Sequence, residues 1–154
     1  MLVEDLMIKD VISVHENDTI ESLIKTLIAC KIGSVPVLDD QDKLAGFVTD
    51  GDILRAVSPK QQTIYDFYTM IAAIEVEVSR DKIKDLLNKK VKEIMKKKNL
   101  QTVYVNKDLD AVLKILSHHH FKKLPVIDSE RHVVGMISRS NIIRYFGELA
   151  IGQK

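Results

Sequence analysis

The same succession of apolar and polar segments occurs twice along the chain. In each copy a short extended run (11–14; 102–105) leads through a polar turn into apolar residues at helical spacing, which predicts an amphipathic helix. The apolar positions of the two helices are Ile20, Leu23, Ile24, Leu27 and Ile28, and then Leu109, Val112, Leu113, Ile115 and Leu116. Two short apolar runs follow in each copy (35–38 and 44–48; 124–127 and 133–137), and a closing helix is expected near Asp50 and near Arg139. The pattern predicts β-α-β-β-α twice, an α/β (α+β) fold.

The two copies match residue by residue at a constant spacing. Paired residues lie 89 positions apart and have like chemistry: Pro36 with Pro125, Gly46 with Gly135, Thr49 with Ser138, Asp52 with Asn141, and Arg55 with Arg144. Upstream, Met7 pairs with Met95 at 88 positions, so one residue was inserted near the start of the second copy. Matches in order at one spacing indicate an internal repeat.

A connecting segment over residues 59–90 separates the copies. Apolar residues at 64, 68, 71 and 78 trace a helical stripe, and Ser79 is expected to cap a second helix that continues to Ile94. The segment is predicted to be an amphipathic linker packed on its own module, and a partner-binding helix is the alternative.

Composition narrows the class of protein. Lys and Arg number 23 against 22 Asp and Glu, whereas a dedicated nucleic-acid binder usually has a basic excess. The single Cys30 lies among apolar residues and is expected to be buried, and no disulfide within the chain is possible. The first residues do not resemble a signal peptide, and no apolar run approaches the about 18 residues of a membrane span. We therefore expect a cytoplasmic protein without membrane insertion.

Residues 46–52 (GFVTDGD) have the chemistry of a nucleoside site. Gly46 permits a close backbone approach, and Thr49 stands where a strand gives way to a helix whose free N–H groups suit phosphate. Asp52 lies on the same helical side, where its carboxylate can accept hydrogen bonds from both hydroxyls of a ribose. Alternatively, Thr49 and Asp52 only cap the helix.

Both copies resemble the CBS (cystathionine-beta-synthase) motif, and the pair resembles a stand-alone Bateman module. The resemblance rests on DLMIKDVISV, KIGSVPVLDD and GFVTDGDILR in the first copy, and on EIMKKKNLQTV, FKKLPVID and GMISRSNIIR in the second. It divides the chain into motif 1 (1–58), the connecting segment (59–90) and motif 2 (91–150). It implies sheet-to-sheet packing about a pseudo-two-fold axis, two clefts, and modules that pair into homodimers. The implied ligands contain adenosine (AMP, ADP, ATP, S-adenosylmethionine or cyclic di-AMP), and their occupancy alters a partner protein.

The resemblance also assigns residues to the two clefts. The first cleft matches the motif in full and adds a basic pair, so the implied ligand-binding residues are Phe47, Val48, Thr49, Asp50, Gly51, Asp52, Gln101, Thr102, Lys122 and Lys123. The second is weaker, because Asn141 lacks the charge of an Asp and Gly33 and Ser34 supply no cation; its residues are Ile12, Ser13, Ser34, Val35, Ser138 and Asn141.

Neither a catalytic residue nor a metal site is predicted, and no cofactor is expected to be required. No nucleophile–base pair is evident, and the adjacent residues His118, His119 and His120 point about 100° apart on a helix, so they cannot converge on one ion. Apolar residues of the closing helices, Ile53, Leu54, Val57, Ile142, Ile143 and Phe146, are expected to be exposed and to form a dimer interface. A regulatory, energy-sensing nucleotide module is the leading hypothesis. A ligand-free structural or oligomerisation module and a nucleic-acid-associated regulator using the lysines of 89–98 are the alternatives.

Overall fold

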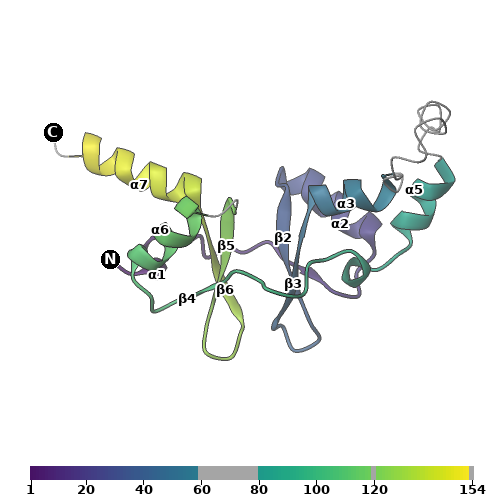
Figure 1. Cartoon of the computed structure of the whole chain (residues 1–154), viewed down its shortest axis with the longest axis horizontal. Coiled ribbons are helices and arrows are strands. Elements are labelled where there is room, and N and C mark those ends of the chain that lie inside the picture. The colour runs from purple at the N-terminus through teal and green to yellow at the C-terminus, as the bar shows by residue number, and fades with distance from the viewer. Residues whose placement is uncertain (59–79, 119–120, 153–154) are drawn as a thin grey trace, which may run out of the picture.

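Two three-stranded sheets form the centre of the molecule (Figure 1). The computed structural model describes residues 1–58, 80–118 and 121–152. The first sheet has the order β1 (Val14–His15), β2 (Ser34–Leu38) and β3 (Leu44–Thr49), and the second repeats it with β4 (Val103–Tyr104), β5 (Lys123–Ile127) and β6 (Val133–Ser138). In both sheets the first strand is parallel to the second and the second antiparallel to the third. The predicted fold class and repeat are confirmed.

Helices flank each sheet as the apolar spacing predicted. In the first copy α2 (Ile20–Cys30) precedes β2 and α3 (Asp50–Val57) follows β3, and in the second copy α6 (Leu109–His118) and α7 (Arg139–Ile151) have the same places. The hydroxyl of Thr19 accepts a hydrogen bond from the Ser22 N–H at 3.1 Å, which satisfies one free donor of the first turn of α2. Helix α2 ends at Cys30, and Lys31, which follows it, has a φ of 54° in the left-handed region.

Each half of the molecule is completed by a segment that lies outside its own copy in the sequence. Helix α1 (Val3–Leu6) packs on α7 and β6, and Val3 is fully buried in the core of the second copy. Helix α5 (Arg80–Leu87) and the 3-10 turn η2 (Val91–Glu93) pack on the first copy, where Val91 is fully buried. The two segments that cross between the halves are visible in Figure 1. The division at residues 58 and 90 is therefore one of repeat units, and as a division into domains it stays a prediction.

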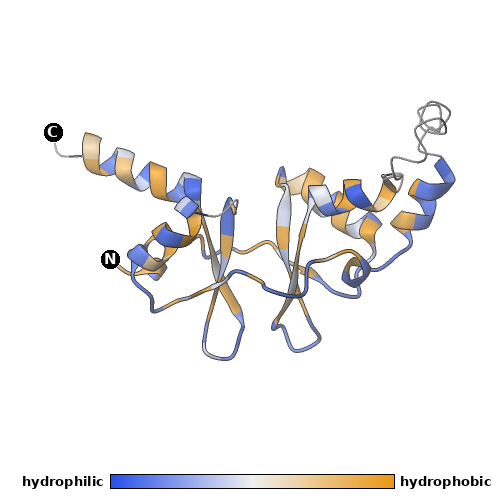
Figure 2. Ribbon diagram, in the orientation of Figure 1, coloured by the Kyte–Doolittle hydropathy of each residue, from blue (hydrophilic) through white to orange (hydrophobic). Residues whose placement is uncertain are grey.

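The crossing segments pair with the last strand of each sheet. The Ile8 N–H donates to the Met136 carbonyl at 2.8 Å, and the Phe47 N–H donates to the Lys96 carbonyl at 3.0 Å. The sheets also meet at the hairpin tips, where the Leu44 N–H donates to the Arg131 carbonyl at 3.0 Å. Figure 2 shows polar residues at these tips and apolar residues on the strands above them. These contacts fix the two sheets side by side.

Four sequence expectations differ from the structure. Cys30 is exposed, because the buried face of α2 consists of Ile20, Leu23 and Leu27 and Cys30 lies beyond it. Ile142 is buried in the second core instead of being exposed. The helix expected to run from 79 to 94 ends at Leu87, and the first strands of both copies are two residues long. The stripe at residues 64–78 lies outside the described residues.

Helix α7 nevertheless presents an apolar face to solvent. Ile143 and Phe146 are exposed on α7, and Leu54, the first-copy counterpart of Ile143, is exposed on α3. Ile53 and Val57 are half-buried. Among the described residues, no helix is both long and apolar enough to cross a membrane.

Candidate functional site

A cleft of about 980 Å³ lies where the two copies meet. Its volume falls in the range of about 300–1,000 Å³ that is typical of small-molecule sites. Most of its lining consists of residues related by the repeat, so the cleft straddles the pseudo-two-fold axis. The related pairs are Ile8 with Lys96, Ile32 with Phe121, Gly33 with Lys122, Ser34 with Lys123, Phe47 with Met136, Thr49 with Ser138, Asp50 with Arg139, and Asp52 with Asn141.

The first copy contributes the end of β3 and the start of α3. The hydroxyl of Thr49 accepts a hydrogen bond from the Asp52 N–H at 3.2 Å, and the Asp52 carboxylate accepts one from the Thr49 N–H at 2.9 Å. This reciprocal capping box places the carboxylate at the helix N-terminus, where the partial positive charge favours it. The helix-capping role considered for this pair is therefore realised, and Asp52 still lines the cleft.

Asp52 also forms an ion pair with a residue one turn along α3. The Arg55 guanidinium donates to Asp52 Oδ1 at 2.7 Å, with 18% of the Asp52 side chain exposed and 71% of that of Arg55. Gly51 leaves room for this contact, because a Cβ there would lie 3.1 Å from Arg55 Nη1.

The second copy repeats the capping box with an amide. Asn141 Oδ1 accepts hydrogen bonds from the Ser138 N–H at 2.9 Å and from the Ser138 hydroxyl at 2.7 Å. The Ser138 hydroxyl also lies 2.9 Å from that of Ser140, the counterpart of Gly51. Within the described ranges Arg144, the counterpart of Arg55, forms no ion pair and does not line the cleft.

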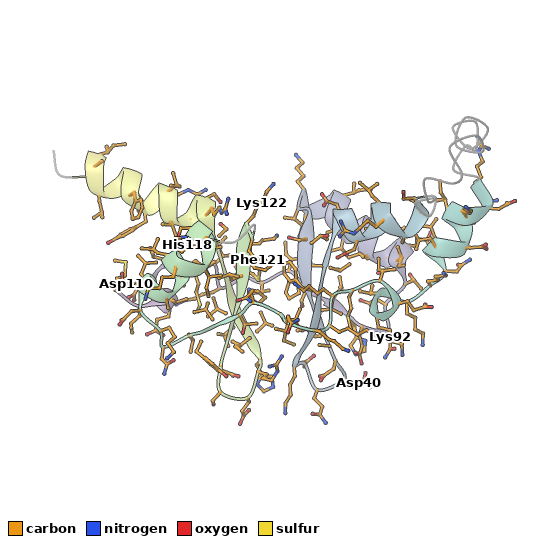
Figure 3. The ribbon with its side chains drawn as sticks, in the orientation of Figure 1. Asp40, Lys92, Asp110, His118, Phe121 and Lys122 are labelled. Carbon is orange, nitrogen blue, oxygen red and sulfur yellow. The ribbon has the colours of Figure 1, made fainter. Side chains whose placement is uncertain are left out.

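The start of β5 supplies the basic pair. Lys122 is exposed, and Figure 3 shows it at the edge of the second copy that faces the first. The Lys123 ammonium donates to the Ser34 carbonyl at 2.8 Å. Lys123 and Ser34 occupy equivalent positions of the repeat, so this hydrogen bond links the two copies. Burial lowers the pKa of Lys123, because the charged form loses solvation in its half-buried position.

Aromatic rings give the cleft apolar surface. Phe47 and Phe121 both line it and are half-buried. The ammonium of Lys96 lies 5.5 Å from the centre of the Phe121 ring, within cation–π range. These rings are flat faces on which a planar ligand group can stack.

The structure brings together residues of both predicted clefts. Ten predicted residues line this cleft: Phe47, Thr49, Asp50, Asp52, Lys122 and Lys123 from the first set, and Ile12, Ser34, Ser138 and Asn141 from the second. Val48 and Val35 are fully buried in the first core, with no exposed side chain. Gly51, Gln101, Thr102 and Ser13 do not line this cleft. The ligand-binding role of all these residues stays a prediction.

Several lining residues were missed by sequence reasoning. Arg55 had been noted only as part of the repeat, although its spacing from Asp52 places the two side chains on one helical face. Phe121 stood in a quoted motif without a role. Lys96, Asp10 and Ile8 come from the crossing segments, whose course no local pattern indicated.

No cluster of potential metal ligands exists among the residues that the structure describes. His118 ends α6, and its two neighbours in the histidine run, residues 119 and 120, lie outside the described residues.

Comparison with known proteins identifies both halves. The family model described as CBS domain matches residues 3–59 and 91–148. L-aspartate semialdehyde sulfurtransferase of Methanocaldococcus jannaschii is 27% identical over 146 residues, which are 95% of this chain. The chain spans 23% of the length of that enzyme.

Solved structures have the same fold. The CBS domain pair of protein MJ0100, in complex with 5′-methylthioadenosine and S-adenosyl-L-methionine, is 29% identical with a TM-score of 0.69, and the match covers 100% of this chain and 98% of that one. CBSX2 of Arabidopsis thaliana in complex with AMP is 23% identical with a TM-score of 0.72, and the match covers 97% and 98% of the two chains.

Proposed function

The chain belongs to the CBS domain family, and from that premise we propose that it binds an adenosine-containing ligand and regulates a partner protein. The proposed ligands are AMP, ADP or ATP, with S-adenosylmethionine and cyclic di-AMP as further members of the class. The proposed role is regulatory and cytoplasmic, without catalysis by these residues.

The distribution of charge across the cleft carries this proposal. The acidic lining residues Asp10, Asp50 and Asp52 all come from the first copy. At the positions equivalent to Gly33, Ser34 and Asp50, the second copy has cations instead: Lys122, Lys123 and Arg139. A nucleotide has matching ends, because ribose hydroxyls donate hydrogen bonds to a carboxylate and phosphate accepts them from ammonium groups.

The size and the apolar surface of the cleft support the same ligand class. The cleft can enclose a whole nucleotide, and Phe47 and Phe121 offer stacking surface for a base. MJ0100, at 29% identity, was solved with two adenosine-containing ligands. The ring surface and the opposed charges together favour a nucleotide over an inorganic anion.

A ligand screen tests the proposal. Melting temperature is measured with AMP, ATP, adenosine, S-adenosylmethionine and 5′-methylthioadenosine, with CMP as a matched pyrimidine control. A ligand at 100 times its Kd stabilises the native state by about 2.7 kcal/mol, which is readily measured. If no adenosine compound raises the melting temperature at millimolar concentration, the ligand-free oligomerisation module becomes the better hypothesis.

We also propose that two chains form a homodimer through their closing helices. Leu54 and Ile143 occupy equivalent positions of the repeat and are 67% and 66% exposed. Phe146 and Leu149 extend the apolar face of α7. Because a two-fold interface is formed by the same patch on both subunits, this face can pair with its own copy.

A further inference from the structure

We infer that Arg55 competes with the ribose for the Asp52 carboxylate, so that a ribose must displace the Arg55–Asp52 ion pair to bind there. The inference rests on the proposed function, because it concerns the same site. Arg55 lines the cleft, and its guanidinium lies 2.7 Å from Asp52 Oδ1.

The Asp52 carboxylate has a limited number of acceptor sites. An ionised carboxylate has about four lone-pair sites, two on each oxygen. Among the described residues, Oδ2 accepts from the Thr49 N–H at 2.9 Å and from the Thr49 hydroxyl at 3.2 Å. Oδ1 accepts from Arg55. One site remains on Oδ1, whereas a ribose with two neighbouring hydroxyls donates two hydrogen bonds.

The bonds that Asp52 already accepts differ in what their loss costs. The Thr49 bonds belong to the capping box, and breaking them leaves the first turn of α3 without its cap. Arg55 is 71% exposed, so water solvates its guanidinium once it leaves. The ion pair is therefore the contact that the ribose displaces.

Among the described residues, the second copy has no equivalent of this ion pair. Arg144 stands one turn after Asn141, as Arg55 does after Asp52, but Asn141 carries no charge to attract it. In addition, Ser140 replaces Gly51, the residue that leaves space for the Arg55 side chain. The competing arginine–carboxylate ion pair is thus expected in the first copy alone, and Arg144 is a matched control.

Adenosine is the suitable probe, because it carries the ribose without a phosphate that would interact with the lysines. Exposed ion pairs are weak, so Arg55→Gln should tighten adenosine binding about two- to fivefold by calorimetry. Arg144→Gln should leave it unchanged, and Arg55→Lys, which keeps the charge without the planar fork, should fall between wild type and Arg55→Gln.

Salt provides a readout that a merely structural role of Arg55 would not change. Adenosine is uncharged, but added salt screens the exposed Arg55–Asp52 pair. Wild-type affinity for adenosine should therefore rise between 0.05 and about 1 M NaCl, while that of Arg55→Gln stays flat. Equal or weaker adenosine binding by Arg55→Gln, with wild type binding normally, overturns this inference and leaves the proposed function intact. If neither protein binds any adenosine compound, the proposed function fails and this inference fails with it.

Discussion

Replacing Gly46 by alanine should destabilise the fold at the seam between the crossing segment and β3. A Cβ at Gly46 would lie 2.6 Å from Met95 Sδ and 2.7 Å from the Lys96 carbonyl oxygen. The methionine side chain can move aside. The carbonyl is backbone, however, and it is held by the hydrogen bond from the Phe47 N–H.

The expected loss of stability follows from the contacts that must move to make room for the Cβ. Overpacking of this kind typically costs about 1–3 kcal/mol, and opening the paired Phe47 and Lys96 backbone bonds instead costs about 2 kcal/mol. The alanine also stabilises the protein by about 0.4–1 kcal/mol, because the unfolded chain has fewer conformations than with glycine. The net loss is at most about 2.6 kcal/mol and centres on about 1.3 kcal/mol, which lowers the melting temperature by about 3–5 °C in a chain of this length.

Gly147 in α7 is the matched control. A Cβ there meets no atom within 4 Å, so Gly147→Ala should stabilise the chain by about 0.5–1 kcal/mol through helix propensity. Both variants are melted beside wild type at one protein concentration, with circular dichroism as the signal. A Gly46→Ala protein that melts with wild type would refute the close-approach reasoning, and so would a Gly147→Ala protein that loses as much stability as Gly46→Ala.

Three further predictions concern the ligand and the assembly. Asp52→Ala should weaken AMP binding about tenfold or more, because hydrogen bonds to a charged group contribute about 1.5–3 kcal/mol. Asn141→Ala, which removes the equivalent cap, should have a small effect on AMP binding. Equal losses of affinity by calorimetry would contradict the unequal roles of the two positions. Lys122→Gln combined with Lys123→Gln should weaken AMP binding and its salt dependence but spare adenosine, and equal loss of both ligands would argue against phosphate contacts. Light scattering at micromolar concentration should show a dimer that Ile143→Glu converts to monomers, and a monomeric wild type would refute the interface.

The repeat and the order of elements were evident in the sequence, for a local reason. Helix and strand periodicity depend on neighbours a few residues apart, so the apolar faces of α2 and α6 were predicted from spacing alone. The turn from strand to helix at Thr49 was predictable in the same way, because the capping residues are close together in the chain.

Side-chain exposure was less predictable where the apolar stripe of a helix extends beyond the part of the helix that the core covers. Ile28 and Cys30 continue the apolar pattern of α2 but face solvent, because the sheet covers only one side of the helix. Conversely, Ile142 was expected on the surface and is covered by the second core, which includes Val3 from the far end of the chain.

By itself the sequence determined the two motifs, their strands and helices, and the unequal chemistry of equivalent positions such as Asp52 and Asn141. Only the tertiary structure decided that α1 packs on the second copy and α5 on the first, that Lys123 reaches the Ser34 carbonyl, and that ten residues from the two predicted sets line one cleft. The physical reason is how far apart in the sequence the interacting residues lie. A local pattern shows which face of an element is apolar, but the segment that covers this face is selected by packing and hydrogen bonding between residues far apart in the chain.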